Sequence, residues 1–219
     1  MFNNIAKSYD TLNRILSLGI DIWWRKKAVK QLNNPKKILD IATGTADFAI
    51  SAAKNTNASI IGIDISDNML EIGEKKIKKL NLEHRIILKL GDAEETNFQE
   101  NSFDAITIGF GVRNFENLDL GLKEMYRILK KNGKVAILEP SIPTLFPFKQ
   151  IYNLYFQFLL PKIGGWFSKD KSAYSYLPNS VKSFPPKKEF LKKLKEIGFK
   201  KQKHISLSLG IVSLYVAIK

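Results

Sequence analysis

From residue 37 to residue 138, short β-branched apolar runs alternate with segments of helical periodicity. We expect strands at 37–42, 59–64, 85–90, 103–108 and 134–138, and helices at 48–54, 66–80 and 118–129. Parallel strands need a crossover between them, and a helix is its usual form. The alternation therefore predicts an α/β fold with helices on both faces of a mostly parallel sheet.

The C-terminal third has a different pattern. A helix is expected within 181–197, ending at Gly198, followed by strands at 203–207 and 211–218. Their short Ser/Gly connection predicts an antiparallel hairpin, so the complete sheet should have seven strands. Two segments lie outside the alternation: a helical prelude at 1–34 and a proline- and aromatic-rich insertion at 140–180. We expect 1–219 to form a single domain.

Composition narrows the possible functions. The net charge is +14, but only five of the 35 basic residues are Arg, the side chain suited to bidentate phosphate recognition. Solvated lysine-rich faces are therefore favoured over a nucleic-acid site. The chain has no cysteine, which excludes disulfides, zinc–cysteine sites and a thiol nucleophile. The sequence has no metal-ligand cluster, so we expect a protein without a metal. It also has no signal peptide and no apolar run as long as a membrane span, so we expect a cytoplasmic protein.

Acidic residues follow three of the predicted strands. Asp40 ends the first strand, Asp64 ends the second, and Asp92 follows the third. Ligands of open parallel sheets bind beyond the carboxyl ends of the strands. Asp64 lies 20 residues after Gly44, where an acid accepts hydrogen bonds from a ribose diol. With Asp92 placed to accept from an adenine amino group, these residues outline an adenosine site.

The turn after the first strand does not by itself identify the ligand. Gly44 is the one glycine where a Gly-x-Gly-x-Gly loop has three, and Ala42 and Ala46 take the other positions. A plain strand-to-helix turn and a nucleotide site both fit. The G-x-G-x-x-G pattern and a helix N-terminus for pyrophosphate are missing, which favours a ligand without phosphates, S-adenosylmethionine.

Longer stretches make the chain recognisable. They are 2–13, 17–19, 24–26, 39–47, 91–94, 103–114, 138–141, 174–180 and 210–212. The chain resembles, nearly end to end, the ubiquinone/menaquinone biosynthesis C-methyltransferase family, which includes demethylmenaquinone methyltransferase. This is a branch of the class I S-adenosylmethionine-dependent methyltransferases. The most specific elements are Phe-Gly-Val-Arg-Asn at 110–114 and Tyr-x-Tyr-Leu-x-x-Ser at 174–180.

The resemblance implies the Rossmann-like class I methyltransferase fold and the cofactor S-adenosylmethionine. It implies cofactor contacts at Thr45, Asp64, Asp92 and Ala93, with Gly44 lining the turn and Tyr9 of the prelude closing over the site. The chain departs from the family pattern at three positions. Thr43 and Ala46 replace glycines and should narrow the space for the methionine portion, and Gly109 stands where some relatives have Ser.

A quinol ring carbon becomes nucleophilic when a neighbouring hydroxyl ionises. Arg113 follows the fourth strand, and its fixed charge is suited to stabilising that oxyanion. We therefore predict that Arg113 is catalytic and that Asn114 orients the substrate. Arg113 has a structural alternative, in which it caps a helix or pairs with Glu116 or Glu139.

The expected reaction is methyl transfer from S-adenosylmethionine to a ring carbon of a prenylated quinol, most directly demethylmenaquinol. C-methylation in ubiquinone biosynthesis is the alternative pathway. A basic nucleic-acid methyltransferase or binding module is an alternative of another class, but no Asn/Asp-Pro-Pro-Tyr motif follows the fourth strand. The aromatic insertion predicts burial of a prenyl tail and peripheral contact with the inner face of a membrane, or a packed cap over the sheet.

Overall fold

The computed structural model describes residues 10–11, 13–15, 17–154, 180–181 and 183–219. Its helices are α2 (Asp21–Val29), α3 (Asp47–Asn55), α4 (Asp67–Lys79), α5 (Leu118–Ile128), α6 (Phe148–Leu154) and α9 (Lys187–Ile197), with 3-10 turns η1 (Val112–Asn114) and η3 (Ser208–Gly210). The strands are β1 (Lys37–Ile41), β2 (Ser59–Asp64), β3 (Ile86–Leu90), β4 (Phe103–Gly109), β5 (Leu129–Pro140), β6 (Lys200–Leu207) and β7 (Val212–Ile218).

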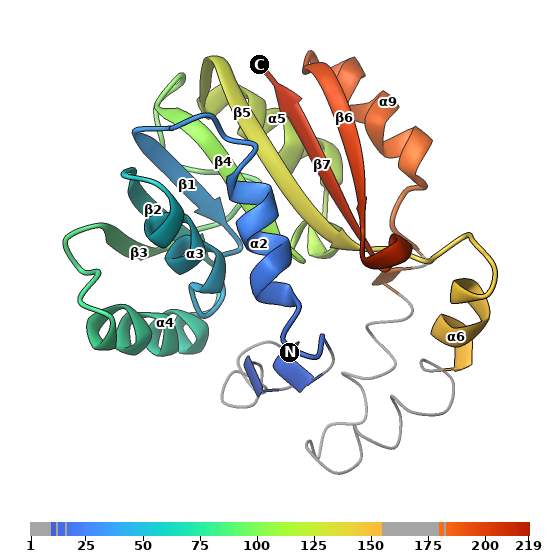
Figure 1. Cartoon of the computed structure of the whole chain (residues 1–219). Helices are drawn as coiled ribbons and strands as arrows, with labels where there is room; N and C mark the ends of the chain where they lie inside the picture. Colours follow the sequence, from blue (N-terminus) through green and yellow to red (C-terminus); the bar gives the residue numbers. More distant parts are fainter. Residues whose placement is uncertain (1–9, 12, 16, 155–179, 182) are drawn as a thin grey trace.

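The described strands form one seven-stranded sheet in the order β3-β2-β1-β4-β5-β7-β6 (Figure 1). Strands β1 to β5 pair in parallel, while β7 is antiparallel to both β5 and β6. The predicted fold class is therefore confirmed, including the C-terminal antiparallel hairpin. The strand order reverses at β1, because β2 lies on one side of it and β4 on the other.

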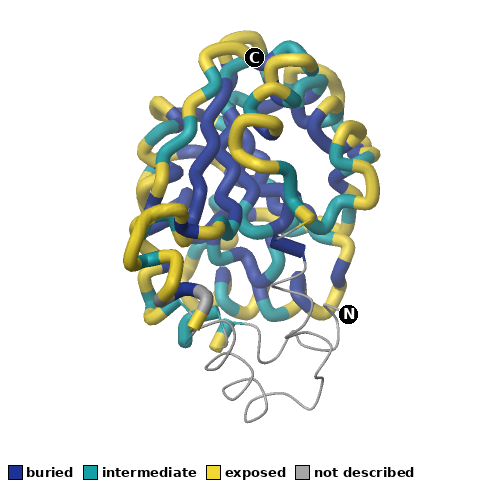
Figure 2. Tube along the Cα trace, turned by 90° about the vertical axis from the view of Figure 1, so that its right-hand side faces the viewer, coloured by how far each residue is buried: buried dark blue, intermediate teal, exposed yellow. Residues whose placement is uncertain are grey.

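Two hydrophobic cores cover the two faces of the sheet. Successive strand residues alternate between them, as Ile38 and Leu39 show: the first packs with α2 and α3, the second with α5 and α9. In Figure 1, α2 crosses in front of the sheet and α5 lies behind it. Figure 2 shows the buried strands running through the middle of the molecule. Burial on both faces explains why the strands are nearly continuous apolar runs.

Two helices begin at residues whose side chains cap the helix N-terminus. The Ser66 hydroxyl accepts from the backbone N–H of Met69 at the start of α4, and the Asn117 side chain accepts from the first N–H groups of α5. Helix α4 also ends in lysines, which interact favourably with the negative end of the helix dipole.

The start of β5 differs most from the sequence prediction. Helix α5 ends at Ile128 and β5 begins at Leu129, well before the predicted start at residue 134. The Asn132-Gly133 pair is therefore a bend within β5, where Asn132 adopts φ +65°. Helix α9 lies within the predicted range 181–197 and starts at Lys187, directly after Pro186, and β6 starts three residues early at Lys200. No helix of the described residues is long and apolar enough to cross a membrane.

Candidate functional site

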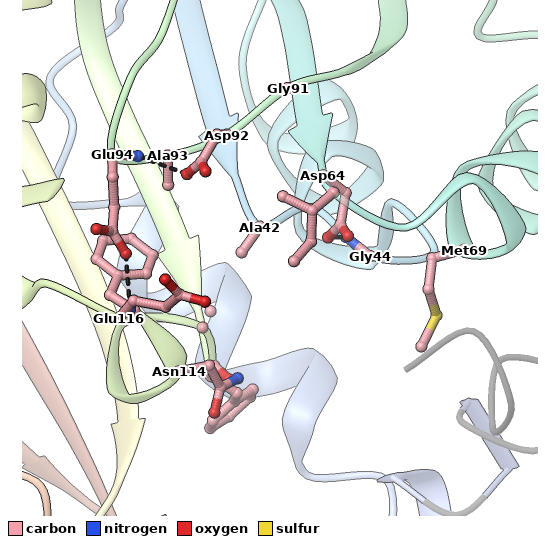
Figure 3. Close-up of a pocket in the computed structure, with 15 residues that line it drawn as sticks. Ala42, Gly44, Asp64, Met69, Gly91, Asp92, Ala93, Glu94, Asn114 and Glu116 are labelled. Atoms are coloured by element: carbon pink, nitrogen blue, oxygen red, sulfur yellow. Dashed lines mark hydrogen bonds between the residues drawn. The ribbon is translucent and has the colours of Figure 1, made fainter. Parts of the chain in front are cut away.

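A cavity of about 240 Å³ opens at the carboxyl edge of the sheet, where the strand order reverses (Figure 3). Ala42, Asp64, Gly91 and Gly109, at the ends of β1, β2, β3 and β4, contribute to its wall. The other lining residues are Gly44, Ile65, Met69, Asp92, Ala93, Glu94, Phe110, Gly111, Asn114, Phe115 and Glu116. Four of the six predicted cofactor residues, Gly44, Asp64, Asp92 and Ala93, are therefore brought together, and so is Asn114.

The Asp64 carboxylate is held by backbone groups rather than by cations. It accepts hydrogen bonds from the N–H groups of Gly44 and Ser66 at 2.8 and 2.9 Å. Burial raises the pKa of Asp64, and these hydrogen bonds offset part of that rise. The carboxylate is thus fixed in orientation at the rim of the turn, and no cation of the described residues pairs with it, which suits an acceptor for a ribose diol.

The opposite side of the cavity is built from the loop after β3. Asp92 accepts from the N–H of Glu94 at 2.8 Å, which fixes its carboxylate beside Ala93 at the cavity wall (Figure 3). Glu94 in turn accepts from the N–H of Glu116 at 2.7 Å and from that of Asn117. It joins the loop after β3 to the start of α5, and no local sequence pattern signals that contact.

The turn between β1 and α3 adopts the backbone of a three-glycine loop although it contains one glycine. Ala42, Gly44 and Ala46 all have left-handed backbone angles, with φ of +50°, +55° and +65°. These are the three positions where a Gly-x-Gly-x-Gly loop has glycine. A left-handed conformation costs an L-residue about 1–2 kcal/mol, so the turn is strained at both alanines.

Asp40 holds this turn in place through hydrogen bonds inside the protein. Its wholly buried carboxylate accepts hydrogen bonds from the Thr43 and Thr107 hydroxyls, both at 2.6 Å, and from the N–H of Ala49 at 3.1 Å. Burial raises the pKa of Asp40 to about 6 in spite of these donors. Thr43, the largest departure from the family pattern, thus turns its hydroxyl into the protein and does not line the 240 Å³ cavity.

Thr45 does not line that cavity either. It borders a neighbouring hollow of about 30 Å³ that shares Ala42, Gly44, Gly109 and Phe110 with the larger cavity. Its hydroxyl donates to Asp10 of the prelude, and the Lys76 ammonium lies 3.1 Å from the same oxygen. Predicted contact residue Tyr9 lies outside the described residues.

Asp47, at the first position of α3, faces the same hollow. It forms ion pairs with Lys76 and, at 3.6 Å, with Arg25 of α2. Burial acts to raise the pKa of Asp47, but the surrounding cations, Arg25 foremost, outweigh it and hold the pKa below 3.8. A carboxylate at this helix N-terminus repels a pyrophosphate, which is the group that dinucleotides place there.

Arg113 pairs with Glu139, which is one of the structural alternatives that the sequence offered. Its Nη1 lies 2.9 Å from Glu139 Oε2, and the two side chains are 8% and 1% exposed. Arg113 is not part of the cavity wall, whereas its neighbour Asn114 is. The catalytic role of Arg113 stays a prediction. Among the described residues, no three His, Asp or Glu side chains gather in a way that could hold a metal ion.

Comparison with known proteins identifies the family. The sequence profile of the ubiE/COQ5 methyltransferase family matches residues 1–219. The chain belongs to this family. A demethylmenaquinone methyltransferase of Bacteroides fragilis is 46% identical over 222 residues, which cover 100% of this chain and 91% of that protein. The ubiquinone/menaquinone biosynthesis C-methyltransferase UbiE of Citrifermentans bemidjiense is 49% identical over 223 residues, covering 100% and 94%.

Solved structures support the fold. An S-adenosylmethionine-dependent methyltransferase from Aquifex aeolicus has a TM-score of 0.65 at 15% identity, covering 89% of this chain and 88% of that one. Phosphoethanolamine N-methyltransferase 2 of Haemonchus contortus, solved with S-adenosylmethionine, has a TM-score of 0.66 at 16% identity, covering 100% and 60%. Family and fold together make this ubiE/COQ5 family member an S-adenosylmethionine-dependent methyltransferase, as the resemblance implied.

Proposed function

We propose that the protein transfers a methyl group from S-adenosylmethionine to a ring carbon of a prenylated quinol, with demethylmenaquinol as the acceptor. The observation that carries this proposal is the full-length match to relatives named for that chemistry, together with a cavity that brings Asp64 and Asp92 to one space. The ubiquinone precursor is the second acceptor to test, because the UbiE relative is named for both pathways.

The cavity suits the adenosine part of the cofactor. Asp64 provides acceptors for the ribose hydroxyls, while Asp92 and the backbone at Ala93 face the adenine edge. Because Thr45 and Asp47 border the adjoining hollow beneath the same turn, we place the methionine portion toward it. Arg25 also lines that hollow, and its guanidinium is paired there with Asp21 and Asp47.

When bound, S-adenosylmethionine would supply its sulfonium methyl group to the nucleophilic ring carbon and leave as a neutral thioether, and the methylated ring carbon would then release its proton. The protein's task is then to hold the acceptor carbon in line with that methyl and to exclude water. Phe110, Gly111, Asn114 and Phe115 form the part of the wall that follows β4. Their mixture of aromatic surface and one side-chain amide suits a quinol ring with polar hydroxyls.

On the acceptor side, Asn114 is the predicted residue whose side chain reaches the cavity. Its amide can donate to a quinol oxygen and orient the ring. The predicted oxyanion role of Arg113 requires its guanidinium to leave Glu139. In the structure as it stands, that charge is already paired.

The direct test is incubation with methyl-labelled S-adenosylmethionine and reduced demethylmenaquinone, followed by mass analysis of the product. We expect one label per acceptor, attached to ring carbon. Parallel reactions with demethylated ubiquinone precursor and with duplex DNA or RNA test the other acceptors. Label in nucleic acid and none in either quinol would overturn the proposal.

We also propose peripheral contact with a membrane surface, since a prenylated acceptor resides in lipid. Large apolar side chains project into solvent before and within α6: Leu145, Phe146 and Leu154 are 63%, 80% and 62% exposed. Leu209 of η3 is 57% exposed and lies beside this segment, because Ser141 hydrogen-bonds to Gly210 and Ile211. The insertion also carries Lys149, Lys162, Lys169 and Lys171, whose charges suit contact with anionic headgroups. Lys149 is among the described residues, whereas the other three lysines and most of the insertion's aromatics lie outside them.

Sedimentation with anionic and with neutral lipid vesicles tests this contact. Phe146→Thr should reduce the bound fraction. The matched control is Ile87→Thr, which removes another exposed apolar side chain, from β3 at the far edge of the sheet. Equal binding by wild type and Phe146→Thr would refute a contact through this segment.

A further inference from the structure

Arg113 has an unusual set of partners for a residue next to a ligand cavity. Its Nη1 donates to Glu139 and to the backbone carbonyl of Phe110, and its Nε donates to the Ser180 hydroxyl at 3.2 Å. The backbone N–H of Arg113 also points to Glu139, at 3.4 Å. One guanidinium thus joins three separate parts of the chain.

Two of these partners mark the ends of the insertion. Glu139 is the residue before it, at the end of β5, and Ser180 is its last residue. They are 41 positions apart in sequence, yet both contact the same side chain. Ser180 also completes the Tyr-x-Tyr-Leu-x-x-Ser motif, which nothing in the cofactor site accounts for.

The third partner is part of the cavity wall. Phe110 lines the cavity and has a left-handed backbone, φ +62°, a conformation that is unfavourable for a bulky residue. The hydrogen bond from Arg113 to its carbonyl, together with the bond from its own N–H to Leu138, holds it there. Gly111 and Asn114 follow within the same short segment and also line the cavity.

We propose that Arg113 is a positioning residue that ties Glu139 and Ser180, at the two ends of the 140–180 insertion, to the cavity-lining residues on either side of it, 109–111 and 114–116. This rests on the proposed function, because that function assigns these lining residues to the acceptor side of the site. Arg113 acts through Glu139, Ser180 and Phe110 rather than on the acceptor itself. The guanidinium thereby fixes the part of the wall at which the acceptor meets the methyl donor.

The chemistry of the cluster fits a positioning role. A buried ion pair is no more stabilising than well-packed apolar residues of similar volume, so stability alone does not account for it. Arg supplies several donors in a planar fork, which is what contacting three acceptors at once requires, and Lys cannot reproduce that geometry. Burial raises the pKa of Glu139 and the Arg113 charge offsets part of that rise, which is consistent with mutual dependence of the two groups.

Ser180→Ala is the most informative variant, because it removes one hydroxyl and leaves the ion pair intact. We expect kcat/KM for the quinol to fall about tenfold, the loss of one hydrogen bond to a charged group, with unchanged S-adenosylmethionine affinity. Ser180→Thr, which keeps the hydroxyl, should restore activity. The matched control is Ser183→Ala, an exposed serine three residues further on.

Hydrogen exchange of the same variants gives a readout that does not depend on turnover. Ser180→Ala should speed amide exchange at 109–116 and at both ends of the insertion together. Wild-type exchange at 109–116 would overturn the proposal, and so would a lowered melting temperature with normal quinol kinetics. If wild type methylates no quinol but the coupled exchange is present, the proposed function fails while the tie between insertion and wall stands.

The pH profile separates positioning from direct catalysis. A positioning role predicts that Arg113→Lys lowers kcat/KM by the same factor at every pH. The reason is that the arginine does not promote ionisation of the quinol, so its loss leaves the pH dependence unchanged. Recovery of Arg113→Lys turnover at high pH would mean that the guanidinium acts on the quinol hydroxyl, and would overturn the proposal.

Discussion

Replacing Asp40 by Asn should change how stability depends on pH. The buried carboxyl has a pKa of about 6 in the folded protein against an ordinary value of 3.8. Each pH unit between two pKa values is worth about 1.4 kcal/mol, so this difference corresponds to about 3 kcal/mol. Because Asp40 is fully buried, solvent screening does not reduce the figure.

The sign follows from which state holds the proton more tightly. The folded protein keeps Asp40 protonated at pH values where the unfolded chain has released the proton. This residue's contribution to the unfolding free energy is therefore greatest below about pH 4, falls as pH rises toward about 6, and is constant above that. Desolvation of the charge, in part compensated by the Thr43 and Thr107 hydroxyls, is the physical cause.

The amide introduced by Asp40→Asn does not titrate, and it can keep the polar contacts of the carboxylate. Its oxygen can accept from Thr43 and Ala49, while its NH₂ group donates to the Thr107 oxygen. The difference in unfolding free energy, wild type minus Asp40→Asn, should therefore fall by about 3 kcal/mol between about pH 4 and pH 7. Thr107→Val, which removes a donor to the carboxylate, should extend the fall to higher pH.

Urea unfolding at a series of pH values measures this difference, and comparison of variants cancels the effect of the +14 net charge. Glu71→Gln is the matched control, since it removes an exposed carboxyl from α4. Parallel pH profiles for wild type and Asp40→Asn would refute the reasoning. They would mean that the carboxyl is as well solvated in the folded chain as in the unfolded one.

Three further predictions concern the turn and the cofactor. Asp64→Asn should weaken S-adenosylmethionine binding about 10–100-fold by calorimetry, the effect of losing a charged acceptor, and unchanged affinity would remove Asp64 from the site. Ala42→Gly should raise the unfolding free energy by about 0.5–1 kcal/mol, because relief of the left-handed strain exceeds the added entropy of the unfolded chain; a less stable variant would contradict this. Chelation by EDTA should leave methyl transfer unchanged, and a loss reversed by magnesium would show metal dependence.

Much of the architecture could be predicted from local patterns. All seven strands and the helices α3, α4 and α5 lie within a few residues of their predicted ranges. Asp64 and Asp92 could be found because acids that follow parallel strands gather at one edge of the sheet. The largest boundary error lies at β5, which begins at Leu129 rather than at residue 134 because the strand continues through the bend at Asn132.

Other features of the site had no local signal. Glu94 reads as a surface turn, and only its contact with the N-terminus of α5 brings it to the cavity. Arg113 had two possible carboxylate partners, Glu116 and Glu139, besides a role as a helix cap, and the choice of Glu139 depends on the pairing of β4 with β5. It stays a prediction that 1–219 forms a single domain with a prelude at 1–34 and an insertion at 140–180. The role of Tyr9 also stays a prediction.

The sequence by itself determined the elements and the chemistry at their ends, because hydrophobic periodicity follows directly from the repeat of a helix or a strand. The tertiary structure alone decided which distant groups meet. Asp40 and Thr107 are 67 residues apart and become hydrogen-bond partners only because β1 pairs with β4 in one register. Ser180 and Arg113 are also 67 residues apart and form a hydrogen bond only in the folded chain. Such contacts depend on strand order and crossovers, which no local run of residues specifies.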